Sequence, residues 1–187
     1  TDVQYSLPVL SANARKRYFL NPVPDDFYTG NEDDAVTLPN GTVIDFANSP
    51  VIEDGLKETY FSFQWGDALF VTLDPYWYTM RKPFSGSRGG EINDETDVGT
   101  RWDWTLGTNQ YQWLKNTLEQ SEAKFKFVFA HHVTGGTHDY ARGGVEGAAY
   151  NEWGGHDNPE INSDMPWTFN VNRPTFEMPI HQMMAAN

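Results

Sequence analysis

The sequence predicts an α/β fold, and three stretches of the chain carry that prediction. Residues 60–73 have the pattern of a β-hairpin, residues 109–122 that of an amphipathic helix, and residues 125–130 that of an apolar strand. Helix and strand thus alternate along the chain, as they do where helices pack on a sheet. The 187 residues suffice for one domain with a sizeable core. We therefore expect a single domain over residues 1–187.

The first part of the chain, residues 1–57, is expected to be rich in loops. Leu10–Phe19 predicts one short helix, for which Ser11 is a candidate cap. Acidic residues then gather in residues 25–34. This cluster could be a calcium loop, but it lacks the alternation of ligands that an EF-hand needs. A solvated acidic loop is the favoured interpretation.

The hairpin is the clearest secondary-structure signal. Tyr60–Trp65 alternates apolar and polar side chains, so its large aromatic residues share one face. Gly66-Asp67 suits a two-residue turn, and Ala68–Asp74 is the expected return strand. The aromatic residues on the shared face are Phe61, Phe63 and Trp65.

The remaining elements are predicted from the spacing of apolar residues and from the glycine and proline residues that interrupt helices and strands. Residues 76–103 are loop-like, and the helix over Asn109–Glu122 has Thr108 as a candidate cap. Residues 133–174 predict one long loop, and Thr175–Ala186 predicts a terminal helix. The apolar stripe of the helix over residues 109–122 consists of Tyr111, Leu114 and Leu118, at i, i+3 and i+7.

Composition excludes several classes of function. The net charge of −13 and the pI near 4.6 argue against capture of nucleic acid or of anionic membrane. The chain has no cysteine, which excludes disulfides, thiolate zinc sites and cysteine nucleophiles. No stretch reaches the roughly 20 apolar residues of a membrane span. An acidic chain without cysteine fits an extracellular or periplasmic protein.

Two adjacent histidines are the strongest functional signal. His131 and His132 end the apolar run that begins at Phe125, and a glycine-containing loop follows them. A strand that delivers a histidine to the carboxyl edge of a sheet is a common way to build a metal site. Consecutive strand residues point to opposite faces, so the two rings are not expected to bind one ion. The alternative is a hydrogen-bonded structural pair.

Four segments together resemble calcineurin-like metallophosphoesterases, the superfamily of purple acid phosphatases and phosphodiesterases. In order and spacing they are similar to the family's hairpin, the helix before its histidine strand, that strand, and the helix before its final metal motif. The resemblance covers most of residues 58–187. The segments are SFQWGDALFVTLD (62–74), QYQWLKNTL (110–118), FVFAHH (127–132) and PIHQ (179–182).

The resemblance implies a mixed β-sandwich flanked by helices, and a phosphoesterase that activates water with two divalent or trivalent metal ions (Fe, Zn or Mn). His131 would be the metal ligand of this chain. His132 would lie near the substrate, a small phosphate ester, and Arg142 suits phosphate oxygens. No residue of the chain is predicted to be a catalytic acid or base.

Departures from the family pattern open an alternative. The motifs Asp-x-His, Gly-Asn-His and Gly-His-x-His are absent, and three partial matches, Gly30-Asn31-Glu32, Gly66-Asp67 and Gly155-His156-Asp157, do not fit as ligands. We expect an internal segment that is inactive alone, with an incomplete sandwich whose exposed sheet edges permit self-association. The alternative is a non-catalytic structural or binding protein that retains the fold without the metal site.

Overall fold

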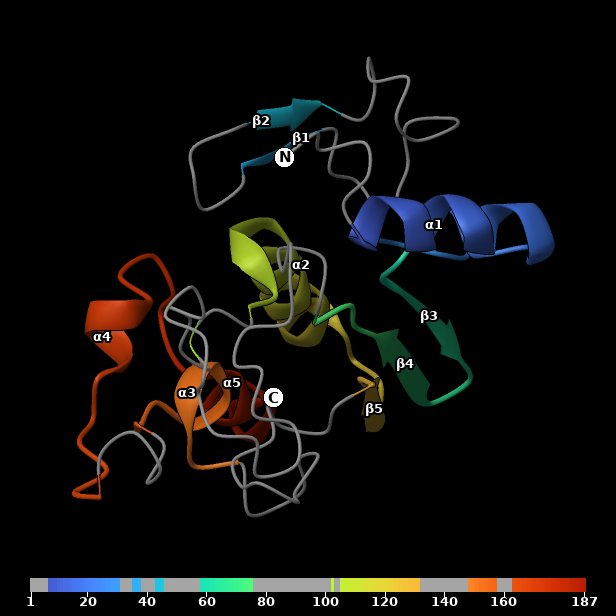
Figure 1. Cartoon of the computed structure of the whole chain (residues 1–187). Coiled ribbons are helices and arrows are strands. Elements are labelled where there is room, and N and C mark those ends of the chain that lie inside the picture. Colours follow the sequence, from blue (N-terminus) through green and yellow to red (C-terminus); the bar gives the residue numbers. More distant parts are fainter. Residues whose placement is uncertain are drawn as a thin grey trace.

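Figure 1 shows the computed structural model of the chain. The residues that it describes are 7–30, 35–37, 43–45, 58–75, 102, 105–131, 148–157 and 163–187. The elements are, in order, α1 (Leu7–Tyr18), β1 (Ala35–Thr37), β2 (Val43–Asp45), β3 (Phe61–Trp65), β4 (Ala68–Thr72), α2 (Gly107–Gln120), β5 (Phe125–Phe129), α3 (Asn151–Gly154), α4 (Phe169–Asn172) and α5 (Ile180–Ala186).

The central sheet is mixed, with strand order β3-β4-β5. β3 and β4 form the predicted antiparallel hairpin, in which Trp65 is paired with Ala68 across the Gly66-Asp67 turn. Gly66 has φ of +57°, a backbone angle that favours glycine. β5 returns through α2 and pairs parallel with β4, in register from Ala68 with Phe125 to Thr72 with Phe129. The α/β prediction, with a mixed sheet and flanking helices, is confirmed.

One face of this sheet belongs to the hydrophobic core. Leu69 and Val71 of β4 are buried, and they form one cluster with Leu114 and Leu118 of α2. α5 adds to the same core, because it packs against α2 and α3. The remaining buried members are Leu73, Trp102, Leu106, Tyr111, Ala123, Phe169, Phe176, Ile180 and Met183. The apolar stripe predicted for residues 109–122 therefore faces the core as expected.

The opposite face of the sheet is aromatic. Phe63, Phe70 and Phe127 lie at one level on the three strands. Their rings are stacked, at 5.0 Å between the centroids of Phe63 and Phe70 and 5.4 Å between those of Phe70 and Phe127. Phe27, from the turn after α1, stacks on Phe63 at 5.5 Å. We call the seven residues Phe61, Phe63, Trp65, Phe70, Phe125, Phe127 and Phe129 the aromatic face.

The structure corrects the limits of three predicted helices. α1 begins at Leu7, so Ser11 lies inside the helix and does not cap it. α2 begins at Gly107, so Thr108 is also internal, and the N–H of Gly107 donates instead to the hydroxyl of Thr105 at 3.0 Å. The terminal helix begins at Ile180, directly after Pro179, and not at Thr175. A proline fixes φ and cannot donate to a helix interior, which explains a start immediately behind it.

The prediction of one long loop over residues 133–174 is wrong for the part that the structure describes. α3 and α4 lie within it, and α3 packs against α5 and α4. Both helices have only four residues, too few for a helical period to show in the sequence. The loop-rich region 1–57 likewise contains the short antiparallel pair β1–β2. Within the described ranges, no helix is both long and apolar enough to cross a membrane.

Candidate functional site

The carboxyl ends of β4 and β5 lie at the same edge of the sheet, because the two strands are parallel. The backbone N–H of Leu73 donates to the carbonyl of Phe129 at 2.8 Å, so the pairing continues one step beyond β4. Asp74 and His131 follow at this edge, the first half-buried and the second exposed. In open sheets this edge is where ligands bind. It is the candidate functional site of the chain.

The structure locates one of the three residues predicted for the site. His131 lies two residues beyond the end of β5. His132 and Arg142 lie outside the described residues, so their predicted contact with substrate stays a prediction. Among the residues that were placed, no group of three or more histidine, aspartate or glutamate side chains could hold a metal ion.

A buried glutamine fixes the backbone at this edge. Gln110 of α2 is 1% exposed. Its Oε1 accepts from the N–H of Asp74 at 2.8 Å, and its Nε2 donates to the carbonyl of the same residue at 2.8 Å. Nε2 also donates to the carbonyl of Leu106 at 3.2 Å. The side-chain amide thus satisfies both backbone groups of Asp74 and binds them to the first turn of α2.

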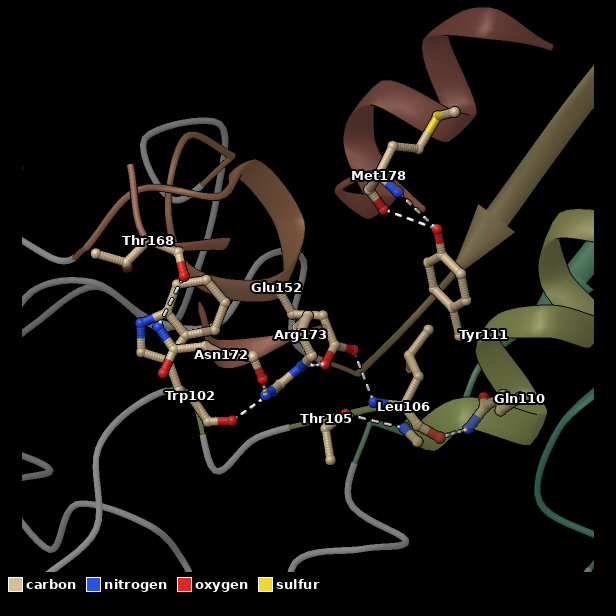
Figure 2. Close-up of polar contacts among 11 residues, drawn as sticks. Trp102, Thr105, Leu106, Gln110, Tyr111, Glu152, Thr168, Asn172, Arg173 and Met178 are labelled. Atoms are coloured by element: carbon tan, nitrogen blue, oxygen red, sulfur yellow. Dashed lines mark hydrogen bonds and ion pairs between the residues drawn. The ribbon is translucent and has the colours of Figure 1, made fainter. Parts of the chain in front are cut away.

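A buried ion pair holds the chain directly before α2 (Figure 2). Glu152 of α3 is 3% exposed and forms a salt bridge with the Nε of Arg173. Its Oε1 accepts from the N–H of Leu106 at 2.8 Å. Arg173 also donates to the carbonyls of Trp102 and Asn172, and its guanidinium lies 5.4 Å from the centroid of the Trp102 ring. Both charges therefore have partners, as buried charges require.

Tyr111 connects α2 to the segment before α5. Its hydroxyl donates to the carbonyl of Met178 at 2.8 Å and accepts from the N–H of the same residue at 3.1 Å (Figure 2). Its ring stacks on Phe176 with 3.9 Å between centroids. Burial raises the pKa of Tyr111, and hydrogen bonds from the backbone of Met178 and Glu177 oppose this increase. The tyrosine is therefore a neutral donor at neutral pH.

Two of the partial metal motifs have structural roles. Nδ1 of His156 lies 2.8 Å from the carbonyl of Met165, and the ring packs edge-on against Trp167. The carboxylate of Asp157 accepts from the indole N–H of Trp102 at 3.0 Å and from the hydroxyl of Thr168. The Gly66-Asp67 pair forms the hairpin turn, as predicted. Both segments thus contribute to the fold.

Sequence reasoning assigned no role to the polar residues that hold the site. Gln110 carried one usable signal, because it lies four residues before Leu114 and so belongs to the buried stripe of the helix. A polar residue in such a stripe needs a partner. Glu152 belongs to a polar cluster of the predicted long loop, for which packing within the loop was the favoured interpretation, and Arg173 gave no signal. Their contact depends on how α3 and α4 fold back toward Leu106.

Comparison with known proteins identifies the family. The model of the PhoD-like phosphatase family matches residues 45–160, which is more than half of the chain. The match includes the hairpin, α2, β5 and the candidate edge with Asp74 and His131. No curated protein and no solved structure matches the chain. PhoD has a metallophosphoesterase-like fold, which agrees with the fold implied by the sequence resemblance. On this match the chain belongs to the PhoD-like phosphatase family.

Proposed function

We propose that the protein is a metal-dependent phosphoesterase that hydrolyses small phosphate mono- or diesters at the carboxyl edge of β4 and β5. The observation that supports this most strongly is the match to the PhoD-like phosphatase family over the segment that contains Asp74 and His131. PhoD-like phosphatases are metal-dependent. In this proposal His131 is a metal ligand, and His132 and Arg142 contact the phosphate ester.

Two ions of iron, zinc or manganese, when bound, would polarise phosphoryl oxygens and supply hydroxide near neutral pH. The described residues do not by themselves fit such a pair of ions, because they contain no cluster of metal-binding side chains. A metal site needs several ligands with good geometry. We therefore propose His131 as a single contribution to the site, with the other ligands outside the described residues. Residues 1–187 expressed alone are expected to be inactive.

Hydrolysis of an aryl phosphate monoester and of an aryl phosphodiester, with added manganese or zinc, tests this function. The assay compares residues 1–187 with the full-length product of the gene that encodes them. Turnover by the full-length product alone supports the proposal. Comparable turnover by residues 1–187 would mean that the metal site is misplaced, and would bring His156 and Asp157 back into consideration. No turnover by either protein would favour the non-catalytic alternative.

The variant His131→Ala in the full-length product tests the assigned ligand. We expect metal content and turnover to fall together, because an ion that loses a ligand is held less firmly. Asp67→Asn, in the hairpin turn, is the control and should leave both unchanged. Unchanged metal stoichiometry in His131→Ala would contradict the assignment. An extracellular or periplasmic location is proposed with this function, and fractionation of the source cells would test it.

The aromatic face supports a second proposal, that copies of this chain associate through the β5 side of the sheet. Phe125, Phe127 and Phe129 are 46–53% exposed. β5 is an edge strand of the described sheet, and such an edge is a template for pairing with another strand. The strands β3, β4 and β5 contain no acidic residue, although the whole chain has a net charge of −13. The acidic residues that repel one another between two copies would therefore lie outside the surface formed by these strands.

The orientation of the rings favours a protein partner over a carbohydrate. Phe70 is stacked between Phe63 and Phe127, with interplanar angles of 10° and 22°. Both faces of the Phe70 ring are therefore occupied by neighbouring rings, and a sugar that stacks on aromatic faces would find this central ring covered. An apolar layer from a second copy requires only the exposed ring edges.

Sedimentation of residues 1–187 over a range of concentration and salt tests self-association. We expect a dimer that strengthens with salt, because screening weakens repulsion between acidic chains. Phe127→Lys should give a monomer, whereas Gln112→Lys on α2 should not. A monomeric wild-type chain at about 100 μM, a typical concentration for weak dimers, would contradict the proposal. In that case the aromatic face is covered by another part of a longer protein.

A further inference from the structure

We propose that Gln110 is a positioning residue for the phosphoesterase site: its side-chain amide holds the Asp74 backbone at the end of the sheet where His131 also lies. This inference rests on the proposed function. Gln110 does not touch substrate in this proposal, and acts through the backbone that it binds.

The geometry is that of a two-point clasp. The side-chain amide both accepts from and donates to Asp74, and each hydrogen bond is 2.8 Å long. Two bonds to one residue fix its orientation as well as its distance, which a single bond would not do. Gln110 is 1% exposed, so water does not replace these contacts easily.

The clasp lies where the chain leaves β4. One residue beyond β4, the N–H of Leu73 still donates to the carbonyl of Phe129. Asp74 is the next residue along the chain, and Gln110 binds both its N–H and its carbonyl. Loss of the clasp would therefore release the turn at Asp74 while β4 and β5 remain paired.

Further hydrogen bonds hold the Gln110 side chain itself in position. The Nε2 of Gln110 also donates to the carbonyl of Leu106, and the N–H of Leu106 donates to Glu152. Glu152 is in turn held by Arg173. A continuous chain of buried polar contacts thus runs from Arg173 to the edge of the sheet. Figure 2 shows this chain as far as Gln110.

The test compares two single variants of the full-length product at position 110. Gln110→Met removes both bonds to Asp74 at nearly constant volume. Gln110→Glu keeps an acceptor for the N–H of Asp74, but when ionised it places a negative charge against the carbonyls of Asp74 and Leu106. When protonated, the same carboxyl group can donate again. Gln112→Glu, exposed on the same helix, is the matched control.

We expect kcat for the aryl phosphate to fall on the order of 10-fold to 100-fold in Gln110→Met, with a smaller change in KM, because small misplacements cost this much. In Gln110→Glu, kcat should recover as the pH falls and the carboxyl group is protonated. Burial raises the pKa of a carboxyl group, which brings this recovery into a measurable range. Gln112→Glu should follow the wild-type pH profile.

Hydrogen exchange at the Asp74 amide separates the possible failures. Faster exchange in Gln110→Met with unchanged kcat, in protein that is still folded, would overturn the positioning role. A pH profile of Gln110→Glu that parallels Gln112→Glu would do the same. Absence of turnover in the wild-type protein would instead contradict the proposed phosphoesterase function.

Discussion

The two faces of the β3-β4-β5 sheet differ in how they are stabilised. Toward α2, the sheet presents Leu69 and Val71, which are 5% and 0% exposed. Toward the other side it presents the aromatic face, whose Phe127 is 46% exposed. The same strands supply both faces, because successive side chains alternate. The helix-covered side buries aliphatic groups and satisfied polar groups, whereas the aromatic side relies on contacts between rings. A mutation should therefore cost far more on the first side than on the second.

The largest effect is expected at the ion pair behind α2. Glu152→Gln removes the negative charge that faces the Arg173 guanidinium in a buried setting, and this should cost about 3–5 kcal/mol of unfolding free energy. The control is Glu119→Gln, whose pair with Lys115 is on the surface of α2 and should be worth less than about 1 kcal/mol. Urea unfolding of both variants measures the difference. Equal losses would show that Glu152 is not an internal support.

The next effect compares the two faces directly. Leu114→Ala leaves a cavity among Leu69, Val71 and Leu118, and should lower the unfolding free energy by about 3 kcal/mol. Phe127→Ala, on the aromatic face, should cost about 1 kcal/mol in the monomer, since much of its ring is already exposed. Unfolding at low protein concentration measures both. A larger loss for Phe127→Ala would reverse the ranking of the two faces.

A third effect is smaller and depends on pH. Tyr111→Phe leaves the backbone of Met178 without its hydroxyl partner and should cost about 1 kcal/mol. The pKa of Tyr111 in the folded protein is raised above its ordinary value. The protonated hydroxyl therefore contributes fully to the free energy of unfolding below about pH 10, and this contribution is lost as the pH rises through the raised pKa. The free energy of unfolding should decline more between about pH 9 and pH 11 in the wild type than in Tyr111→Phe. Tyr150→Phe is the control, and a decline of equal size in all three proteins would contradict this assignment.

The smallest effect concerns the turn that covers the aromatic face near β3. The carboxylate of Asp25 accepts from the N–H groups of Tyr28 at 2.6 Å and Phe27 at 2.7 Å, and these bonds lower its pKa below 3.8. The ionised Asp25 therefore stabilises the turn fully at a pH above its ordinary pKa, and this stabilisation is lost as the pH falls through its lowered pKa. NMR titration of both amides should report this midpoint. Asp25→Asn should abolish it and Asp26→Asn should not. A midpoint at or above 3.8 would contradict the role of these bonds.

Local pattern was sufficient to predict the elements that build the sheet. Alternation predicted the hairpin within a residue or two, and the 3.6-residue period predicted α2 and its buried stripe. The position of His131 beyond the last strand followed from the apolar run that ends there. These features depend on neighbours in the sequence, which is why they could be read from it. Helix ends were less predictable, because Ser11 and Thr108 have the chemistry of caps without occupying the positions.

The supports of the candidate site could not be predicted in the same way. The clasp joins Gln110 to Asp74, and the ion pair joins Glu152 to Arg173. Each is a contact between segments that are distant in the sequence and have no shared pattern. Nor could sequence alternation tell that β5 would have its phenylalanines exposed, since an edge strand and a central strand can carry the same apolar residues. Both features arise only once the segments have packed.

The parallel pairing of β4 with β5 also sets an order of events in folding. β3 and β4 meet across a two-residue turn, so this hairpin can form within microseconds. β5 must instead close the long crossover through α2 before Val128 reaches Val71. Contacts between distant parts of a chain form late, because their loop entropy is lost before the contact stabilises the fold. His131 therefore reaches the edge after the hairpin has formed, together with the α2 contacts that hold Asp74. A ligand that requires both residues would bind only the completed sheet and slow its unfolding.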